Sequence, residues 1–246
     1  MKFSVITVTF NNFIGLKKTL KSLAKFNKKK YEHIVIDGGS NNRTLDLIKK
    51  YSSRIDKWVS ERDEGIYDAM NKGLKFVSDE NNIISFLNSG DAALSNYFKD
   101  VEKKFKKNTL LDFCYAGLIL VGKKRQTKYL PKILSKKSEY LQRMALPHPS
   151  LFTKKKIFSK IGYFDLNKQL TADHQWCVRL IRSDAKGVRL NKPVVKFKLD
   201  GASLKLRAQF EIFQTALQYE RNIIIAVIFL ARQLISHLYY IYKSKC

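Results

Sequence analysis

The stretch FSVITVTFNNFIGLKKTLKSLAKF, residues 3–26, decides how this chain folds. Its first eight residues are mostly β-branched or aromatic, a composition typical of a strand buried in a parallel sheet. In the residues that follow, Ile14, Leu20, Leu23 and Phe26 recur at roughly helical spacing. A strand followed at once by a helix is the repeating unit of α/β proteins. The stretch therefore predicts the first such unit.

Three further strand and helix pairs follow along the chain. The strands are YEHIVID (31–37), DKWVSE (56–61) and NIISFL (82–87), and the helices are RTLDLIKKY (43–51), IYDAMNKGLKFV (66–77) and SNYFKDVEKKFKK (95–107). This alternation predicts the fold class α/β, with a mostly parallel central sheet, right-handed crossovers and helices on both faces.

Polar residues follow the predicted strands. In open α/β sheets, ligands bind at the edge formed by the carboxyl ends of the strands. The polar residues expected at this edge are Asn11, Asp37, Glu61, Asp63 and Asp91. The sequence therefore predicts a ligand site there.

The pattern changes after about residue 110. Residues 110–130 contain two apolar runs around a basic Gly-Lys-Lys-Arg turn, which predicts a hairpin. Residues 148–165 read as a strand and a short helix, and residues 171–183 as a helix with Thr171 at its N-cap. Residues 187–203 are expected to form one or two more strands. The remainder is expected to be helical.

No internal repeat or Pro/Gly/Ser-rich linker divides the chain. A chain of 246 residues that is 45% apolar can bury one sizeable core. We therefore expect one main domain over residues 1–203, made of the halves 1–95 and 96–203, and a separate helical segment over residues 204–246.

The net charge is the strongest compositional signal, because 47 Lys and Arg against 21 Asp and Glu give +26. Such a charge indicates anionic partners: nucleic acid, phosphorylated small molecules or the anionic inner face of a membrane. The alternative is that the lysines merely solvate helix faces. They occur at helical spacing between apolar residues, and no nucleic-acid-binding motif is visible, so we do not expect nucleic acid as a partner.

The cysteines and the N-terminus bear on location. Cys114, Cys177 and Cys246 are odd in number and far apart, which favours neither a disulfide framework nor a zinc site. The first residues lack a small-residue cleavage site and read as a strand rather than a signal peptide. The expected location is the cytoplasm.

Two segments near the predicted edge suggest a ligand site. In IDGGSNNRT, Asp37 precedes two glycines, which would let the backbone approach a ligand closely, although a structural turn would look the same. In SERDEGIYDAMNKGLKF, Gly65, Ala69 and Gly73 are four residues apart and predict a close-packed helix face. The alternative there is simple packing of the helix on the sheet.

Asp91 follows the fourth predicted strand in ISFLNSGD. A carboxylate suits magnesium or manganese, which take one or two carboxylates and fill their other positions with phosphate oxygens and water. A helix cap is the alternative role for a lone aspartate at a strand end.

Seven segments in order resemble the motifs of family 2 glycosyltransferases with the GT-A fold, in particular the bacterial branch that builds capsule, O-antigen and exopolysaccharide. They are VITVTFNN, VIDGGSNNRTLDLIKKY, SERDEGIYDAMNKGLKF, ISFLNSGD, HPSLF, IGYFD and TADHQWCVRL, and they cover roughly residues 1–200. The resemblance implies transfer of a sugar from a nucleoside-diphosphate sugar, expected to be UDP-linked, to a hydroxyl of a lipid-linked or growing polysaccharide.

The resemblance also implies roles for single residues in donor binding. Asp37 would contact the base or ribose, and Asp91 would bind Mn²⁺ or Mg²⁺. Similar proteins usually read Asn-Ser-Asp-Asp where this chain has Gly90 in place of the first aspartate. The full set of donor-binding candidates is Thr9, Phe10, Asn11, Asp37, Asp63, Gly65, Asn71 and Ser89.

Asp173 in TADHQW matches the catalytic base of the family. An inverting transfer needs a carboxylate that takes the proton of the attacking hydroxyl. Asp173 falls in the first turn of a predicted helix, where the helix dipole favours the ionised form. His148 resembles the position that faces the acceptor, although Pro149 replaces the usual glutamine. His174 is expected to neighbour the site without binding metal.

Residues 222–242 form the most apolar segment of the chain. Arg232 lies within it, and an arginine at mid-membrane costs about 3 kcal/mol, which disfavours a spanning helix. The sequence leaves open a helix in the membrane interface and a helix packed on the catalytic domain or on a second subunit. The charge favours an enzyme at the inner face of the cell membrane, and a homodimer stays possible.

Two alternatives to this enzyme stay open. One is a basic α/β protein that binds nucleic acid, in which case its affinity would depend steeply on salt. The other, suggested by Gly90, is a degenerate transferase fold that serves as a binding subunit.

Overall fold

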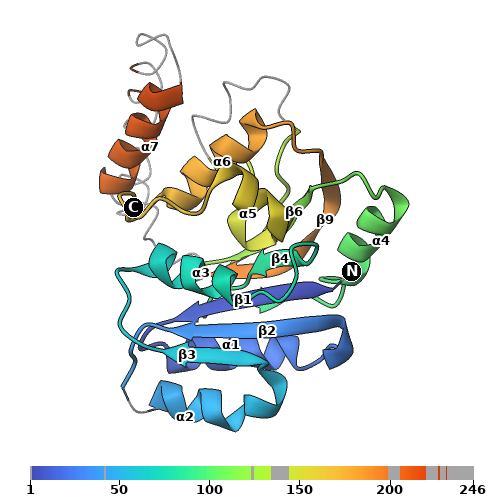
Figure 1. Ribbon diagram of the computed structural model, residues 1–246, viewed down its shortest axis with the longest axis vertical. Coiled ribbons are helices and arrows are strands. Elements are labelled where there is room, and N and C mark those ends of the chain that lie inside the picture. Colours follow the sequence, from blue (N-terminus) through green and yellow to red (C-terminus); the bar gives the residue numbers. More distant parts are fainter. Residues whose placement is uncertain are drawn as a thin grey trace.

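The computed structural model describes residues 2–41, 43–122, 125–133, 144–198 and 206–219, with the isolated residues 227 and 231. Within this part of the chain, nine strands form one sheet in the order β3-β2-β1-β4-β8-β6-β9-β5, and β7 pairs with β6. Helices cover both faces of this sheet (Figure 1). The predicted α/β class is confirmed.

The first half of the sheet is parallel, as the sequence predicts. It contains β1 (Phe3–Thr9), β2 (Tyr31–Asp37), β3 (Lys57–Ser60) and β4 (Ile83–Phe86). In the register, Thr9 lies beside Asp37, and Asp37 lies beside Ser60. The carboxyl ends of these strands therefore meet at one edge.

The helices of this half lie on opposite faces of the sheet (Figure 1). They are α1 (Phe13–Leu23), α2 (Arg43–Lys50) and α3 (Ile66–Lys75). Val35 of β2 packs in one apolar cluster with α1 and α2, whereas its neighbours Ile34 and Ile36 pack in another with α3. Successive residues of a strand face opposite sides of a sheet, so α1 and α3 are separated by it.

The second half of the sheet is mixed. The strands β6 (Phe113–Val121) and β7 (Gln126–Tyr129) form the predicted hairpin. β8 (Leu151–Lys154) runs antiparallel to β4 and β6, and β9 (Gly187–Lys198) runs parallel to β6. The two-residue strand β5 (Ala92–Ala93), which the sequence does not predict, pairs antiparallel with β9.

Four helices accompany this half. They are α4 (Lys99–Lys107), α5 (Lys155–Ile161), α6 (Ala172–Arg182) and α7 (Leu206–Tyr219). α7 packs on α6 through Val178 and Ala216, with Phe213 and Tyr219 against them. The described beginning of the C-terminal segment thus contacts the main body. The apolar segment 222–242 lies outside the described residues, apart from residues 227 and 231.

Helix α1 buries a different set of residues from the set that the sequence predicts. Ile14 was predicted on the apolar face of the first helix, but its side chain is 81% exposed. The helix begins at Phe13, and its buried apolar residues are Leu16, Leu20 and Leu23, so Ile14 falls on the outer side. None of the helices in the described residues is long and apolar enough to cross a membrane.

A buried histidine predicts how stability depends on pH. His33 on β2 is 1% exposed and shares a 3.0 Å hydrogen bond with the Thr7 hydroxyl. Burial, with the nearby Lys28 charge, lowers the pKa of His33 from 6.5 to about 3. The unfolded chain therefore binds a proton below about pH 6.5 that the folded chain does not bind until about pH 3, so stability falls as the pH drops between these values.

We expect the free energy of unfolding to fall by about 2 kcal/mol between pH 8 and pH 5 because of this residue. Urea denaturation at both pH values measures the change, and the His33→Gln variant is the control. The fall should be smaller in the variant by about this amount, and the rest comes from other groups such as the buried His148, whose pKa burial also lowers. An equal fall in variant and wild type would contradict the assignment.

Candidate active site

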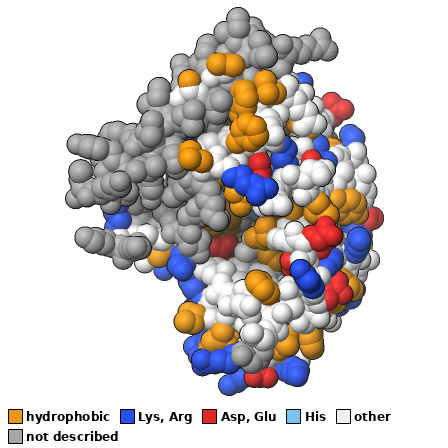
Figure 2. All heavy atoms as spheres, turned by 90° about the vertical axis from the view of Figure 1, so that its left-hand side faces the viewer, with side chains coloured by type: hydrophobic (Ala, Val, Ile, Leu, Met, Phe, Trp, Pro, Cys, Tyr) orange, Lys and Arg blue, Asp and Glu red, His pale blue; other side chains and the backbone are white. Residues whose placement is uncertain are grey.

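The carboxyl ends of β1, β2, β3 and β4 carry loops that hydrogen-bond to one another. The Asn11 amide donates to the Ser40 hydroxyl at 2.7 Å, which joins the loops after β1 and β2. The Asn12 side chain donates to the Ser89 carbonyl at 3.3 Å, which joins the loops after β1 and β4. Figure 2 faces this side of the molecule, where acidic and basic side chains are interspersed. The loops form one connected surface.

The loop after β1 holds an unusual backbone conformation. Asn11 has φ of 47°, the one positive value at a described residue other than glycine. Asparagine tolerates this region better than most residues. Phe10 beside it is 61% exposed, and the Thr9 side chain before it is buried. The conformation therefore presents an aromatic ring at the end of a buried strand.

Asp37 is fully buried at the end of β2. Its carboxylate accepts hydrogen bonds from the Ser40 amide at 2.8 Å, the Ser40 hydroxyl at 2.5 Å and the Ser60 hydroxyl at 2.6 Å. A carboxylate has about four acceptor positions, so most are occupied. In this arrangement Asp37 holds the loops after β2 and β3 together, and its predicted contact with base or ribose stays a prediction.

The loop between β3 and α3 lies against the loop after β2. A Cβ at Gly38 would come within 2.4 Å of Asp63 Oδ2, so a larger residue there would force the Asp63 side chain to move. Asp63 Oδ1 accepts a 3.0 Å hydrogen bond from the Gly65 amide. Gly65, the N-cap of α3, has φ of 119°, a backbone conformation that favours glycine.

The predicted close-packed stripe on α3 is only partly correct. A Cβ at Gly73 would lie 2.5 Å from Ile6 Cγ2, and Ala69 is 2% exposed, so both contact the sheet closely. A Cβ at Gly65 would have no atom within 4 Å. Gly65 is therefore required by backbone conformation and not by packing.

The loop that carries Asp91 is held by helix α1. The Thr19 hydroxyl accepts from the Gly90 amide at 3.1 Å and lies 2.7 Å from the Asp91 carbonyl, to which it donates. Lys18 Nζ donates to the Gly90 carbonyl at 2.8 Å. Gly90 has φ of 112°, where an aspartate would be strained. The replacement of the usual carboxylate thus accompanies a glycine conformation, and Asp91, 5% exposed, is the carboxylate of this loop.

Asp173 is joined to the donor side by helix α3. The Tyr67 hydroxyl lies 2.8 Å from Asp173 Oδ1 and 3.0 Å from the Leu170 carbonyl. Tyr67 is in the first turn of α3, which begins at the loop carrying Asp63. Burial raises the pKa of Tyr67 well above its usual value, and the Asp173 carboxylate raises it further, so the phenol stays neutral. The structure thus brings the predicted base to the predicted donor edge.

Thr171 is the N-cap residue of α6, as predicted, but its side chain does not cap the helix. Its hydroxyl instead donates to Glu211 of α7 at 2.9 Å. Glu211 also accepts from the amides of Gln169, Leu170 and Thr171 at 3.0–3.3 Å. A side chain distant in sequence therefore fixes the backbone just before Asp173.

Two predicted site residues are engaged within the protein. The Asn71 side chain exchanges two hydrogen bonds with the Phe164 backbone, at 2.9 and 3.0 Å, and so ties α3 to the second half. His148 is 5% exposed, and its ring stacks on Phe86 at 5.0 Å. Burial lowers the pKa of His148, opposed by Asp173. Protein surrounds this ring, so contact with an acceptor would require a rearrangement.

Comparison of the sequence with known protein families identifies the family of this chain. The model of glycosyl transferase family 2 matches residues 4–184. The chain belongs to this family. It is a glycosyltransferase with a GT-A-like fold. The branch that makes capsule and O-antigen stays a prediction.

The family 2 glycosyltransferase has relatives of known sequence and structure. An uncharacterized glycosyltransferase of Mycobacterium tuberculosis is 33% identical over 181 residues, 72% of this chain and 67% of that protein. Staphylococcus aureus TarS 1–349 in complex with UDP-GlcNAc has a TM-score of 0.67 at 20% identity, covering 95% of this chain and 72% of that one. The mannosyltransferase PcManGT from Pyrobaculum calidifontis, in complex with GDP-Man and Mn²⁺, has a TM-score of 0.65 at 12% identity, covering 96% and 74%.

The residues of this glycosyltransferase fit a metal held jointly with a ligand. Within the described residues, no group of three or more histidine, cysteine or carboxylate side chains is placed to hold a metal. The Asp91 loop offers one carboxylate, and the buried Asn88 Oδ1 has no hydrogen-bond partner in the described part of the chain. Magnesium and manganese often take one protein carboxylate and complete their coordination with phosphate oxygens and water.

Several residues of the site were not found from the sequence. Thr19 and Lys18 hold the Asp91 loop, Tyr67 and Glu211 hold the surroundings of Asp173, and Lys72 pairs with Glu61 at 3.0 Å. Each of these side chains contacts a residue that is distant along the chain or lies in a loop, and local sequence patterns do not reveal such contacts. Tyr67 and Lys72 do lie within the motif SERDEGIYDAMNKGLKF, which is the one sequence signal that pointed to them.

Proposed function

We propose that this enzyme transfers a sugar from a nucleoside-diphosphate sugar to a hydroxyl group, with inversion at the anomeric carbon. The observation that carries the proposal is the 2.8 Å contact between Tyr67 and Asp173. It joins the carboxylate that suits a general base to the helix that starts at the donor edge. A base beside a donor site is what direct displacement needs.

The donor is a nucleotide sugar bound at the loops after β1, β2 and β3. The exposed ring of Phe10 can stack on a base, and Thr9, Asn11, Asp63 and Gly65 surround the same edge. TarS and PcManGT were solved with UDP-GlcNAc and GDP-Man, which supports a nucleotide-sugar donor here. We propose UDP as the nucleotide.

Asp91 would hold Mn²⁺ or Mg²⁺, with Ser89 and Asn88 beside it. A bound metal supplies positive charge that stabilises the departing diphosphate. PcManGT contains Mn²⁺, which supports the same cofactor here. The Thr19 hydroxyl donates to the Asp91 carbonyl and so fixes the position of the loop that would hold the metal.

Asp173 takes the proton of the acceptor hydroxyl while the oxygen attacks the anomeric carbon from the side opposite the diphosphate. Tyr67 and the His174 amide both donate to Asp173 Oδ1 at 2.8 Å. These bonds orient the carboxylate and leave Oδ2 for the hydroxyl. The anomeric C–O bond forms as the bond to the diphosphate breaks, and Asp173 retains the proton.

The acceptor is a hydroxyl of a lipid-linked or growing polysaccharide, presented at the cytoplasmic face of the cell membrane. The net charge of +26 supports an anionic membrane as the working surface. Capsule or O-antigen synthesis is the corresponding pathway class. These assignments rest on charge and on the motifs, and His148 is not needed for them.

A degenerate binding subunit is the second candidate, because Gly90 removes one carboxylate of the metal-binding element and holds φ of 112°. Such a protein would bind a nucleotide without metal linkage and without turnover. Titration with nucleotides in the presence and absence of Mn²⁺ separates this candidate from the active enzyme.

The test is a calorimetric titration of the full chain with UDP, GDP and their sugar derivatives, performed once in Mn²⁺ and once in EDTA. We expect one nucleoside diphosphate to bind at least about tenfold more tightly with Mn²⁺, since a bridging metal adds charge stabilisation. Asp91→Asn should remove this difference, and Asp100→Asn, an equal change in charge on α4, should preserve it. Equal binding with and without metal would overturn the metal role.

A further inference from the structure

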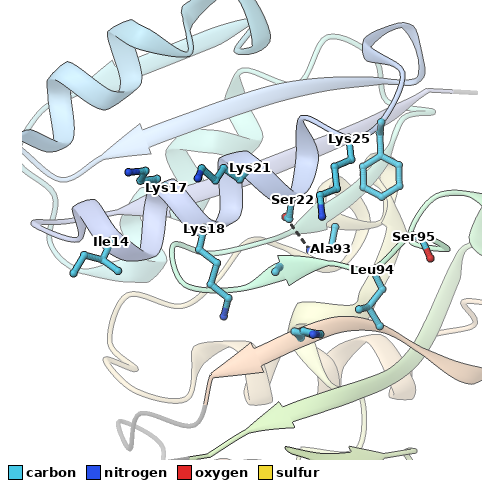
Figure 3. A pocket seen from close by; sticks show the side chains of 12 residues that line it. Ile14, Lys17, Lys18, Lys21, Ser22, Lys25, Ala93, Leu94 and Ser95 are labelled. Atoms are coloured by element: carbon cyan, nitrogen blue, oxygen red, sulfur yellow. Dashed lines mark hydrogen bonds between the residues drawn. The ribbon is translucent and has the colours of Figure 1, made fainter.

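A groove of about 800 Å³ opens between α1 and β9, with the short strand β5 between them (Figure 3). Five lysines line it: Lys17, Lys18, Lys21, Lys25 and Lys196. We call it the lysine groove. The Ala93 amide donates to the Ser22 hydroxyl at 3.0 Å, which fixes β5 against α1 and gives the groove its floor.

Among the residues that the structure describes, no carboxylate balances the charge of the lysine groove. No aspartate or glutamate of the described ranges lines it. In the part of the chain that the structure describes, none of its five lysines forms an ion pair with a carboxylate. Like charges confined to one concave surface repel one another, and an anion bound between them relieves this repulsion. The groove therefore fits an anionic ligand.

The other residues of the lysine groove define the rest of that ligand. Its lining includes Ile14, which is 81% exposed, together with Phe26, Ala93 and Leu94. The described lining residues include no asparagine, glutamine or carboxylate that could bind sugar hydroxyls, and the Ser22 hydroxyl already bonds to the backbone. Lysine ammonium groups suit a phosphate, and the aliphatic surface suits a hydrocarbon chain. This combination matches an amphiphilic phosphate.

The position of the lysine groove separates it from the reacting hydroxyl. α1 lies on the opposite face of the sheet from α3, which carries Tyr67 and contacts Asp173. The groove nevertheless borders the Asp91 loop, because Lys18 donates to the Gly90 carbonyl and Lys196 lies beside Ala92 in the sheet register. An amphiphile bound here would be held near the donor side without occupying the acceptor position.

We propose that the lysine groove binds the phosphate headgroup and first chain carbons of an anionic membrane phospholipid. The bilayer is thus the source of the ligand. The inference deepens the membrane location in the proposed function, but it concerns a different surface from the catalytic one. Its test measures binding alone, so it can fail or succeed independently of sugar transfer.

The experiment measures co-sedimentation of the full chain with vesicles containing about 30% phosphatidylglycerol in phosphatidylcholine, at an ionic strength of about 100 mM. The groove variant carries Lys17→Gln, Lys21→Gln, Lys25→Gln and Lys196→Gln, and leaves Lys18 in contact with the Asp91 loop. The control variant carries Lys75→Gln, Lys128→Gln, Lys160→Gln and Lys186→Gln. These control lysines are exposed and none lines the groove, so the two variants have the same net charge.

Each lysine close to an anionic surface strengthens binding about fivefold, so the groove variant should bind these vesicles at least about fiftyfold more weakly than wild type. The control variant should lose less than about fivefold, because its charges lie farther from the surface. Equal losses in both variants would overturn the proposal in favour of non-specific attraction. Thermal melting of both variants checks that they are folded.

A second measurement distinguishes the source of the phosphate. Soluble dihexanoyl phosphatidylglycerol should bind wild type and not the groove variant, and glycerol phosphate should compete only weakly, since it lacks the chain. Equal competition by glycerol phosphate would show a simple anion site and overturn the lipid assignment. Binding to neutral vesicles doped with an isoprenoid phosphate, without binding to phosphatidylglycerol, would overturn the phospholipid in favour of a lipid-linked acceptor.

Discussion

Replacing Asp173 with asparagine should lower kcat about a thousandfold and leave the donor KM close to its wild-type value. The asparagine keeps an oxygen that accepts from Tyr67 and from the His174 amide, so the local hydrogen bonds of Oδ1 are preserved. It cannot take a proton from the acceptor hydroxyl. The loss should therefore fall on the chemical step and not on donor binding.

The matched control is Asp184→Asn, which makes the same chemical change at an exposed position just after helix α6. Its kcat should stay within about twofold of wild type, since distant exposed charges contribute little. Steady-state rates with varied donor and saturating acceptor give kcat and KM for both variants. If Asp173→Asn retained more than a tenth of the wild-type kcat, another group would have to be the base.

The hydrogen bond between Tyr67 and the predicted base Asp173 could not be predicted from the sequence. The sequence placed Asp173 at the start of a helix, where the dipole favours ionisation. It gave no sign that a phenol from a helix more than a hundred residues earlier would donate to it. The pairing depends on how two halves of the sheet pack, which local spacing does not encode.

The parallel half of the fold was predictable because the local sequence of each segment indicates whether it forms a helix or a strand. A buried β-branched run such as residues 3–9 and an amphipathic helix such as residues 43–50 are recognisable from period and composition alone. The mixed half was less so. Pairing of Ser85 with Phe152, or of Ala92 with Lys196, joins residues far apart in sequence. The two-residue strand β5 has no local signal at all.

The candidate site shows the same division. Position followed from sequence, because strand ends at residues 9, 37, 60 and 86 meet at one edge. The state of each side chain did not. Asp37 already accepts three hydrogen bonds, Asn71 binds the Phe164 backbone, and His148 packs against Phe86. Whether a polar group is satisfied inside the protein depends on neighbours that only the assembled fold supplies.

Removing Glu211 should have the largest effect on stability, because its carboxylate is 5% exposed and accepts four hydrogen bonds. Glu211→Ala would leave the amides of residues 169–171 and the Thr171 hydroxyl without their acceptor. Loss of bonds to a buried charged group costs about 1.5–3 kcal/mol each in isolation, although such losses are not additive. We expect the free energy of unfolding to fall by about 3 kcal/mol, measured by urea denaturation with an unchanged m value.

The same variant tests whether α7 positions the base. The residues that Glu211 holds lead directly into α6, so under conditions where the variant stays folded kcat should fall about tenfold with little change in donor KM. Glu211→Gln, which retains one acceptor oxygen, should recover part of both losses. The control Arg207→Gln removes only the ion pair between the exposed Arg207 side chain and Glu211, which are 3.6 Å apart, and should cost less than about 1 kcal/mol. A folded Glu211→Ala variant with wild-type kcat would show that α7 stabilises the fold but does not position the base. If Glu211 held Asp173 in place, removing its carboxylate would lower kcat.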